Sequence, residues 1–453
     1  MVSLRKSALV YASLLFSLVR GFDLDVTSKT SICSGATDIT NGIMDYYEGY
    51  RYGGTVGEFQ SPYYWWLAGE VFGGMIDTWY FCQNDTYEET IYNALIAQKG
   101  DKNNYIPSNQ SFTEGNDDQG FWGFAVMGAV ERNFTNPTSD DDPSWLELAQ
   151  AVYNTMWARW DNTTCDGGLR WQIFTWNNGY NYKNTISNGC LFHMAARLGR
   201  YLDNDTYADT ASTVWDWMED VGFVVESGDS ISVYDGADIV DDECPTVGED
   251  EWTYNYGILI AGCSYLYNMT GESKWEDRAT SLFNGISIFL KDNVMYERQC
   301  QDSGTCNNDQ RSFKSIFSRS LGMTAVLVPS LYDKVYEVLT ASAQGAAQSC
   351  SGGTDNVTCG QNWSHDGWDG VYGLGEQISA LECIQNLLID QRPGPYKATT
   401  GGSSKSNPDA GLGTSTDTNA NEVDIVRKDK VGAGILTAVV LVAVVSTAVW
   451  MVI

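Results

Sequence analysis

Hydrophobic periodicity is the feature that most narrows what this chain can fold into. Twelve segments carry apolar residues at the spacing of one helix face, whereas strand-like segments are few and short, such as residues 170–174 and 224–234. Helices are therefore expected at residues 36–50, 64–81, 86–98, 117–132, 143–160, 186–202, 205–221, 251–268, 272–292, 311–328, 331–346 and 371–389. This pattern predicts an all-α domain.

The expected helices alternate in character along the chain. Every second helix is rich in small and aromatic residues, as in residues 119–125 and 255–262, and small residues let helix backbones approach closely. The helices between them, such as 272–292, carry a charged face that suits contact with water. The alternation predicts an (α/α)6 toroid of six helical hairpins, with an irregular helical bundle as the alternative.

In such a toroid the first turns of the inner helices meet on one face. The longer loops, residues 163–185, 226–250 and 347–369, are expected on that same face. Loops held by a rigid scaffold are the usual place for binding and catalytic residues. We therefore expect the functional site there.

The first residues predict a secreted protein. A basic start precedes an apolar run that is too short to span a membrane comfortably, and small residues precede a cleavage point after Gly21. Residues 1–21 are thus expected to be a signal peptide, and residues 22–392 the folded domain.

The last residues predict attachment to a membrane. Small residues at 419–421, a polar spacer and the apolar run 431–453 form the pattern of a glycosylphosphatidylinositol (GPI) signal over 419–453, with Asn419 as the attachment residue. An ordinary membrane-spanning helix is the alternative, but it would leave Arg427, Lys428 and Lys430 outside the membrane. The Ser/Thr/Gly-rich residues 393–418 are expected to be a flexible stalk. The predicted location is the cell surface, on the plasma membrane or in a cell wall.

Passage through the secretory pathway predicts disulfide bonds and N-linked glycans. The chain has 11 cysteines, an odd number, with Cys300 and Cys306, and Cys350 and Cys359, as short-loop pairs. Cys263 and Cys383 lie in apolar helical segments and are expected to be free. Glycosylation is expected at Asn84, Asn109, Asn133, Asn162, Asn204, Asn268, Asn356 and Asn362.

Charge and histidine content exclude several classes of function. The chain has 27 Lys and Arg against 58 Asp and Glu, which gives a formal net charge of −31 and argues against nucleic-acid binding. His193 and His365 are its two histidines, which is too few for a three-histidine zinc site. A catalytic triad that depends on histidine is disfavoured for the same reason.

Two adjacent carboxylates, Asp117 and Asp118, open one of the expected inner helices. Helix capping is one explanation, because Asp is favoured where the first N–H groups lack partners. Glycoside hydrolysis is the other, because it needs one ionised and one protonated carboxyl group at the scissile bond. Neighbouring carboxylates repel, which raises one pKa, while helix N–H groups hold the other low.

Sugar rings are bound by aromatic faces and by amide or hydroxyl hydrogen bonds, and such residues cluster at the expected functional face. Core packing and helix capping are the alternatives for each of them. The predicted substrate-binding residues are Trp66, Trp122, Trp176, Tyr180, Asn184, Asn188, Trp252, Tyr254 and Asn255.

Four motifs carry a resemblance to a known family. They are EGNDDQGFW at 114–122, NYKNTISNG at 181–189, EWTYNYG at 251–257 and GLGEQISA at 373–380. With them the chain resembles the fungal GPI-anchored relatives of the endo-α-1,6-mannanases in glycoside hydrolase family 76. The resemblance extends over nearly all of the expected domain and includes the signal, stalk and tail.

This resemblance implies an (α/α)6 barrel that cleaves α-1,6-mannose linkages with retention. Asp117 would be the nucleophile and Asp118 the general acid/base, with Trp252, Tyr254 and Asn255 lining the sugar subsites. No metal or organic cofactor is implied. The donor would be mannan or a GPI-anchor glycan, and transfer of anchored glycoproteins to a β-glucan acceptor would serve cell wall biogenesis.

Two other functions stay open on the sequence. One is a different (α/α)6 glycosidase, such as an inverting enzyme that acts on glucan. The other is a non-catalytic mannan-binding protein that organises the wall, in which the two aspartates are only helix caps.

Overall fold

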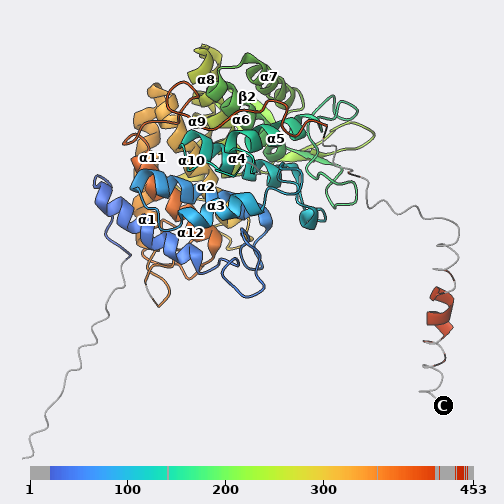
Figure 1. Ribbon diagram of the computed structural model, residues 1–453, viewed down its shortest axis with the longest axis horizontal. Coiled ribbons are helices and arrows are strands. Elements are labelled where there is room, and N and C mark those ends of the chain that lie inside the picture. Colours follow the sequence, from blue (N-terminus) through green and yellow to red (C-terminus); the bar gives the residue numbers. More distant parts are fainter. Residues whose placement is uncertain are drawn as a thin grey trace, which may run out of the picture.

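The computed structural model describes residues 21–139, 142–354, 356–413 and 418, and residues 434, 436–442, 444 and 446. All twelve expected helices are present in the domain (Figure 1). They are α1 (Lys29–Met44), α2 (Trp65–Cys82), α3 (Glu88–Ala97), α4 (Asn116–Glu131), α5 (Trp145–Trp157), α6 (Thr185–Leu202), α7 (Asp205–Asp220), α8 (Thr253–Thr270), α9 (Ser273–Gly285), α10 (Phe313–Leu327), α11 (Tyr332–Ser349) and α12 (Leu374–Gln385).

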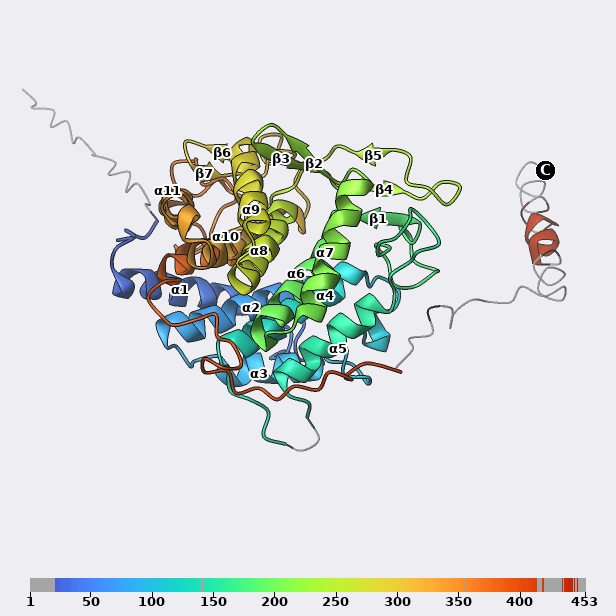
Figure 2. The ribbon, with the colours of Figure 1, turned by 90° about the horizontal axis from the view of Figure 1, so that it is seen from above.

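The even-numbered helices form the inner ring that the alternation predicted. Each of α2, α4, α6, α8 and α10 packs against the next inner helix, and α12 packs against α2 to close the ring. The odd-numbered helices lie outside and contact their inner neighbours (Figure 2). The (α/α)6 toroid is thus confirmed.

The strands are short and antiparallel, and they lie in the connections between helices. β1 (Tyr182–Asn184), β4 (Gly236–Asp238) and β5 (Val247–Gly248) form one sheet, in which Lys183 is opposite Ala237. The expected strand signal at 224–234 is a hairpin of β2 (Val224–Ser227) and β3 (Ser230–Val233). A second hairpin joins β6 (Leu290–Lys291) and β7 (Val294–Met295). The expectation at 170–174 was wrong, because only isolated bridges form there.

Two helices, the first and the ninth, differ most from their expected bounds. The first helix starts at Lys29, capped by Ser28, and ends at Met44 because Tyr47 pairs with Phe59 instead of continuing the helix. The ninth helix ends at Gly285, since the residues after it form a turn of 3-10 helix and then the hairpin of β6 and β7. In both places an apolar pattern continued past the true end of the helix.

The inner helices approach closely where they carry glycine. A Cβ atom on Gly120 of α4 would lie 2.6 Å from Cβ of Cys190 on α6, and one on Gly257 of α8 would lie 2.9 Å from Cα of Phe317 on α10. Any larger side chain at these positions would push two inner helices apart. The small residues of the inner helices therefore set the width of the ring.

A layer of buried charge crosses the ring and involves every inner helix. Arg319 of α10 pairs with Glu70 of α2 at 2.9 Å and with Glu382 of α12 at 2.7 Å. Arg197 of α6 pairs with Glu131 of α4 at 2.7 Å, and Tyr265 of α8 donates to the same carboxylate. Buried charges need partners of this kind because an unpaired charge in the interior is very unfavourable.

Four disulfide bonds are present among the described residues. The two short-loop pairs, Cys300–Cys306 and Cys350–Cys359, are as predicted. The others join Cys33 to Cys82 and Cys165 to Cys244, which ties segments 49 and 79 residues apart. Cys263 and Cys383 are free and buried as expected, and Cys190 is a third free thiol that the sequence did not single out.

The chain after the last helix does not form a flexible stalk from residue 393 onward. Residues 393–413 lie along the domain and hydrogen-bond to it, for example from the Tyr396 amide to the Glu131 carbonyl at 2.9 Å. This part of the predicted stalk was wrong, because its polar residues pair with the helices rather than with water. The structured domain therefore extends beyond residue 392.

The predictions for the two ends of the chain concern mainly residues that the structure does not describe. Residues 1–20 of the expected signal peptide and the attachment residue Asn419 are not described. Within the residues that are described, no helix is both long and apolar enough to cross a bilayer. Six of the eight glycosylation sequons have exposed asparagines, and Asn84 and Asn362 are half-buried.

We predict that Arg319→Met destabilises the domain by about 3–5 kcal/mol, since Glu70 and Glu382 would stay buried without their cation. Guanidinium unfolding followed by tryptophan fluorescence measures the loss. As a control, Lys291→Met removes a solvent-exposed pair with Asp302 and should cost less than about 1 kcal/mol. Equal effects of the two substitutions would show that the charged layer does not stabilise the ring.

Candidate active site

A cavity of about 500 Å³ opens at the face where the inner helices begin. Its wall includes residues from the starts of five inner helices: Trp66 of α2, Asp117 of α4, Asn184 before α6, Tyr254 of α8 and Phe313 of α10. The cavity thus opens at the face where the alternation of helices predicted the functional site. The positive ends of these helices point toward the cavity and favour negative charge there.

Asp117 lies on the cavity wall in the first turn of α4. Its Oδ2 accepts a hydrogen bond of 3.0 Å from the indole N–H of Trp171. Burial raises the pKa of Asp117 to about 7, while the backbone N–H groups of residues 117 and 118 and the Trp171 indole oppose the rise. The three donors favour its ionised form.

Asp118 is the next residue and has a different environment. Its Oδ2 accepts a 2.5 Å hydrogen bond from the amide of Gly115, which completes the cap of α4. Burial and the neighbouring Asp117 raise the pKa of Asp118 well above its ordinary value. Asp118 is therefore the member of the pair that is better suited to hold a proton.

Three further carboxylates line the cavity: Glu114, Asp235 and Asp309. Tyr182 donates to Asp235 at 2.7 Å, and the Trp66 indole donates to Asp309 at 3.1 Å. Burial raises the pKa of each of the three. No Lys or Arg belongs to the cavity wall among the described residues. The site therefore suits neutral or positively charged ligands and disfavours anions.

Aromatic rings cover much of the cavity wall. Tyr254 stacks on Phe313 with ring centroids 3.8 Å apart, and Trp252 meets the same phenyl ring edge-on. Trp66 packs against Phe121 at 4.6 Å. Flat apolar faces beside carboxylates and amides are the surface that sugar rings need.

Four of the nine predicted substrate-binding residues line the cavity: Trp66, Asn184, Trp252 and Tyr254. The other five do not. Trp122 is fully buried and stacks on Tyr105, so it is a core residue. Asn188 is buried and bonds to the backbone of Leu169.

The remaining three support the cavity from outside its wall. Trp176 stacks on Phe174 and donates to the carbonyl of Ser111. Tyr180 lies under the guanidinium of Arg170 at 4.6 Å. Asn255 is buried behind the wall. These five residues therefore pack in the domain or hydrogen-bond to its loops, and none of them lines the cavity.

The sequence did not single out several residues that the fold brings to the cavity. Asp235 lies in the loop region 226–250, which was expected at this face, but nothing distinguished it from the other acidic residues there. Glu114 lies in the motif of the paired aspartates, but no role was predicted for it. Asp309 and Phe313 reach the cavity only because α10 begins beside α8.

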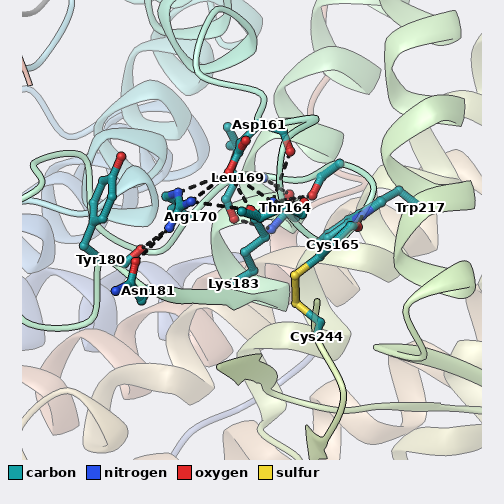
Figure 3. The surroundings of a disulfide bond; sticks show 12 residues. Asp161, Thr164, Cys165, Leu169, Arg170, Tyr180, Asn181, Lys183, Trp217 and Cys244 are labelled. Atoms are coloured by element: carbon teal, nitrogen blue, oxygen red, sulfur yellow. Dashed lines mark hydrogen bonds and ion pairs between the residues drawn. A yellow bond between two sulfur atoms is a disulfide. The ribbon is translucent and has the colours of Figure 1, made fainter. Parts of the chain in front are cut away.

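The loop that carries Trp171 is held by a buried lysine. Figure 3 shows the Lys183 ammonium below the loop, where it donates to the carbonyls of Thr164 at 2.7 Å and Gly167 at 2.5 Å. It also lies 3.5 Å from the Asp161 carboxylate, and the Cys165–Cys244 disulfide joins the same loop to the chain before α8 (Figure 3). The amide of Trp171 donates to the Tyr182 carbonyl at 2.7 Å. These contacts fix the indole that bonds to Asp117.

Comparison with known proteins identifies the family of this chain. A family model described as glycosyl hydrolase family 76 matches residues 31–399. The chain belongs to this family of glycoside hydrolases. The family resemblance drawn from the sequence is thereby confirmed.

Named relatives cover nearly the whole chain. Mannan endo-1,6-alpha-mannosidase DFG5 of Saccharomyces cerevisiae is 58% identical, with 96% of this chain and 95% of that protein covered. The protein of the same name from Candida albicans is 54% identical over 100% of both chains.

Solved structures share the fold. Dfg5 from Chaetomium thermophilum, in complex with glucosamine, matches with a TM-score of 0.82 and 35% identity over 88% of this chain and 100% of that one. The GH76A α-1,6-mannanase of Salegentibacter sp. HEL1_6 matches with a TM-score of 0.63 and 19% identity, over 78% and 98% of the two chains, which shows a common fold.

We predict that Trp171→Phe raises the pKa of Asp117, because it removes an N–H that stabilises the carboxylate. A hydrogen bond to a charged group is worth about 1.5–3 kcal/mol and one pKa unit about 1.4 kcal/mol, so the rise should be roughly one to two units. Carbon-13 NMR titration of labelled aspartate measures it. Trp176→Phe is the matched control, since that indole donates to a backbone carbonyl, and it should leave the titration unchanged.

Proposed function

We propose that this family 76 enzyme is a retaining, endo-acting α-1,6-mannosidase and transglycosylase of the fungal cell surface. The observation that carries the proposal is the pair Asp117 and Asp118 in unlike environments at one aromatic-lined cavity. Two relatives that are 54–58% identical are named mannan endo-1,6-alpha-mannosidases, which supports mannan as the substrate class.

The first step divides the work between the two carboxyl groups. The Asp117 carboxylate attacks the anomeric carbon of the mannose unit at the scissile bond, and the bond to the leaving oxygen breaks. Asp118 gives its proton to that oxygen, so the leaving sugar departs neutral. The donor hydrogen bonds around Asp117 suit the ionised nucleophile, and the raised pKa of Asp118 suits the acid.

The second step releases the mannosyl group from Asp117. Asp118, now ionised, takes a proton from the incoming hydroxyl, whose oxygen bonds to the anomeric carbon as the ester to Asp117 breaks. Water as the acceptor gives hydrolysis, and a sugar hydroxyl gives transglycosylation. We propose a GPI-linked glycoprotein or mannan as the donor and wall β-glucan as the acceptor, which would place the enzyme in cell wall biogenesis.

The proposed location follows from the two ends of the chain. The signal peptide directs residues 22 onward into the secretory pathway, and the GPI signal attaches a lipid anchor at Asn419. The exposed sequons would then carry N-linked glycans. The enzyme would work on the plasma membrane, beside the inner surface of the wall.

The decisive experiment measures products from the full-length enzyme. We expect it to shorten an α-1,6-mannooligosaccharide, and to form a mannosyl–glucan adduct when a β-glucan oligosaccharide is added, both read by mass spectrometry. Asp118→Asn should slow turnover by about 10²- to 10⁴-fold, the usual effect of losing a general acid, and Asp117→Asn by at least as much.

The matched control is Asp277→Asn, an exposed aspartate on outer helix α9, which should keep full activity. Proton NMR of the first product should show the α-anomer if the reaction retains configuration. An inverted product, or turnover of a glucan donor instead, would favour the other (α/α)6 glycosidase. Binding of mannan without turnover, unchanged in Asp117→Asn, would favour a non-catalytic wall protein.

A further inference from the structure

Residues 393–413 form a strap along the outside of the toroid, which we call the C-terminal strap. It starts at the ends of the inner helices, on the face opposite the cavity. There the Tyr80 hydroxyl at the end of α2 donates to the Pro393 carbonyl, and Arg200 at the end of α6 donates to the Pro395 carbonyl at 3.0 Å. The Ala398 amide donates to the Tyr201 carbonyl at 3.0 Å.

The strap then follows outer helix α5 toward the cavity face. Near the start of α5 the Leu146 amide donates to Ser404 at 2.9 Å. One turn further on, Gln150 accepts from the Asn407 amide at 2.8 Å. In the last turns of α5, Asn154 donates to the carbonyls of Pro408 and Ala410 at 2.9 and 2.8 Å. The successive contacts show that the strap runs parallel to α5.

The strap binds one particular face of α5 through several side-chain hydrogen bonds. Glu147, Gln150 and Asn154 are spaced three and four residues apart, so they lie on one side of α5. Glu147 accepts from the Asn407 side chain at 2.8 Å, which gives Asn407 two partners on α5. Figure 2 shows the strap crossing the molecule beneath α3 and α5.

The chain reaches the cavity face at Thr418. Its carbonyl accepts from the amide of Thr175 at 3.3 Å and from the Thr175 hydroxyl at 3.1 Å. Thr175 is two residues before Asn177, which lines the cavity. The C-terminal chain therefore contacts the domain at both faces of the toroid, and Thr418 lies beside the mouth of the cavity.

We propose that the C-terminal strap orients the enzyme on the membrane, with the mouth of the cavity toward the lipid surface. The proposal rests on the membrane attachment inferred under the proposed function, and it adds which face meets the bilayer. With the GPI anchor on Asn419, the residue that follows Thr418 in the sequence, the anchor would join the chain directly beside the mouth of the cavity. The partner surface is the bilayer, and the favoured substrate is a glycan displayed on it.

The cavity mouth suits this position. Tyr64 and Phe112 line the cavity and still expose 57% and 70% of their surface. Aromatic side chains of this kind are enriched where proteins meet the headgroup region of a bilayer. With a net charge of −31, the protein suits neutral headgroups better than anionic ones.

The test measures which face of the full-length chain lies nearer the bilayer. The protein, isolated with its own membrane attachment from a fungal host, is reconstituted into phosphatidylcholine vesicles that contain an acceptor-labelled lipid. A donor dye is attached at Phe112→Cys, at the mouth, or at Lys274→Cys, at the start of α9 on the opposite face. The native free cysteines are buried and should not react.

We expect about twofold higher energy transfer from position 112, because the length of α8, about 27 Å, separates the two faces. The double substitution Gln150→Ala with Asn154→Ala should free the strap and remove the difference between the two positions. Asp277→Ala on α9 is the control and should preserve the difference.

Equal or reversed transfer from the two positions would overturn the proposal, as would failure of the full-length chain to stay on the vesicles. A difference that persists after the double substitution would show that the strap does not set the orientation. Turnover of a soluble mannooligosaccharide is measured in parallel and should be the same with and without the double substitution. If the native chain shows the expected difference in energy transfer but no turnover, the proposed function is contradicted and the proposed orientation still holds.

Discussion

The layer of buried charge across the inner ring is the interaction on which the site depends. Through Arg319, Arg197, their carboxylate partners and the Tyr265 hydroxyl, it ties six helices that would otherwise meet mainly through small and apolar residues. Because the inner helices all run in the same direction, fixing them together also fixes their first turns at one face. The cavity is the space left between those first turns.

That convergence explains how so many carboxylates share one cavity. Helix N-termini carry partial positive charge, and five of them meet around the acidic residues, which offsets part of their repulsion. The offset is incomplete, since the pKa values of Asp117, Asp118 and Asp235 are all raised by burial. The Trp171 indole then gives Asp117 a donor that Asp118 lacks, and this asymmetry favours the ionised form of Asp117 over that of Asp118.

The features that the sequence predicted correctly are local ones. Helix periodicity, the short disulfide loops and the start of an inner helix at the paired aspartates each depend on residues close together in the chain, so they can be predicted without knowledge of the fold. Asp235 and Asp309 could not be found this way, because they reach the cavity from separate connections that only the closed ring brings together. The prediction that Trp122 binds substrate was wrong for a related reason. A tryptophan in a helix gives the same sequence pattern whether it faces the cavity or the core.

The C-terminal strap likewise could not be predicted from amino-acid composition. Gly, Ser, Thr and Asn are typical of flexible linkers because they bury little apolar surface. The same residues have short side chains and free backbone groups, which suits them to hydrogen-bond along a polar helix face such as that of Glu147, Gln150 and Asn154. Whether such a segment is a linker or a strap is thus decided by the surface beside it. Here the polar face of α5 carries the chain from one face of the toroid to the other, so the fold itself brings Thr418 beside the candidate active site.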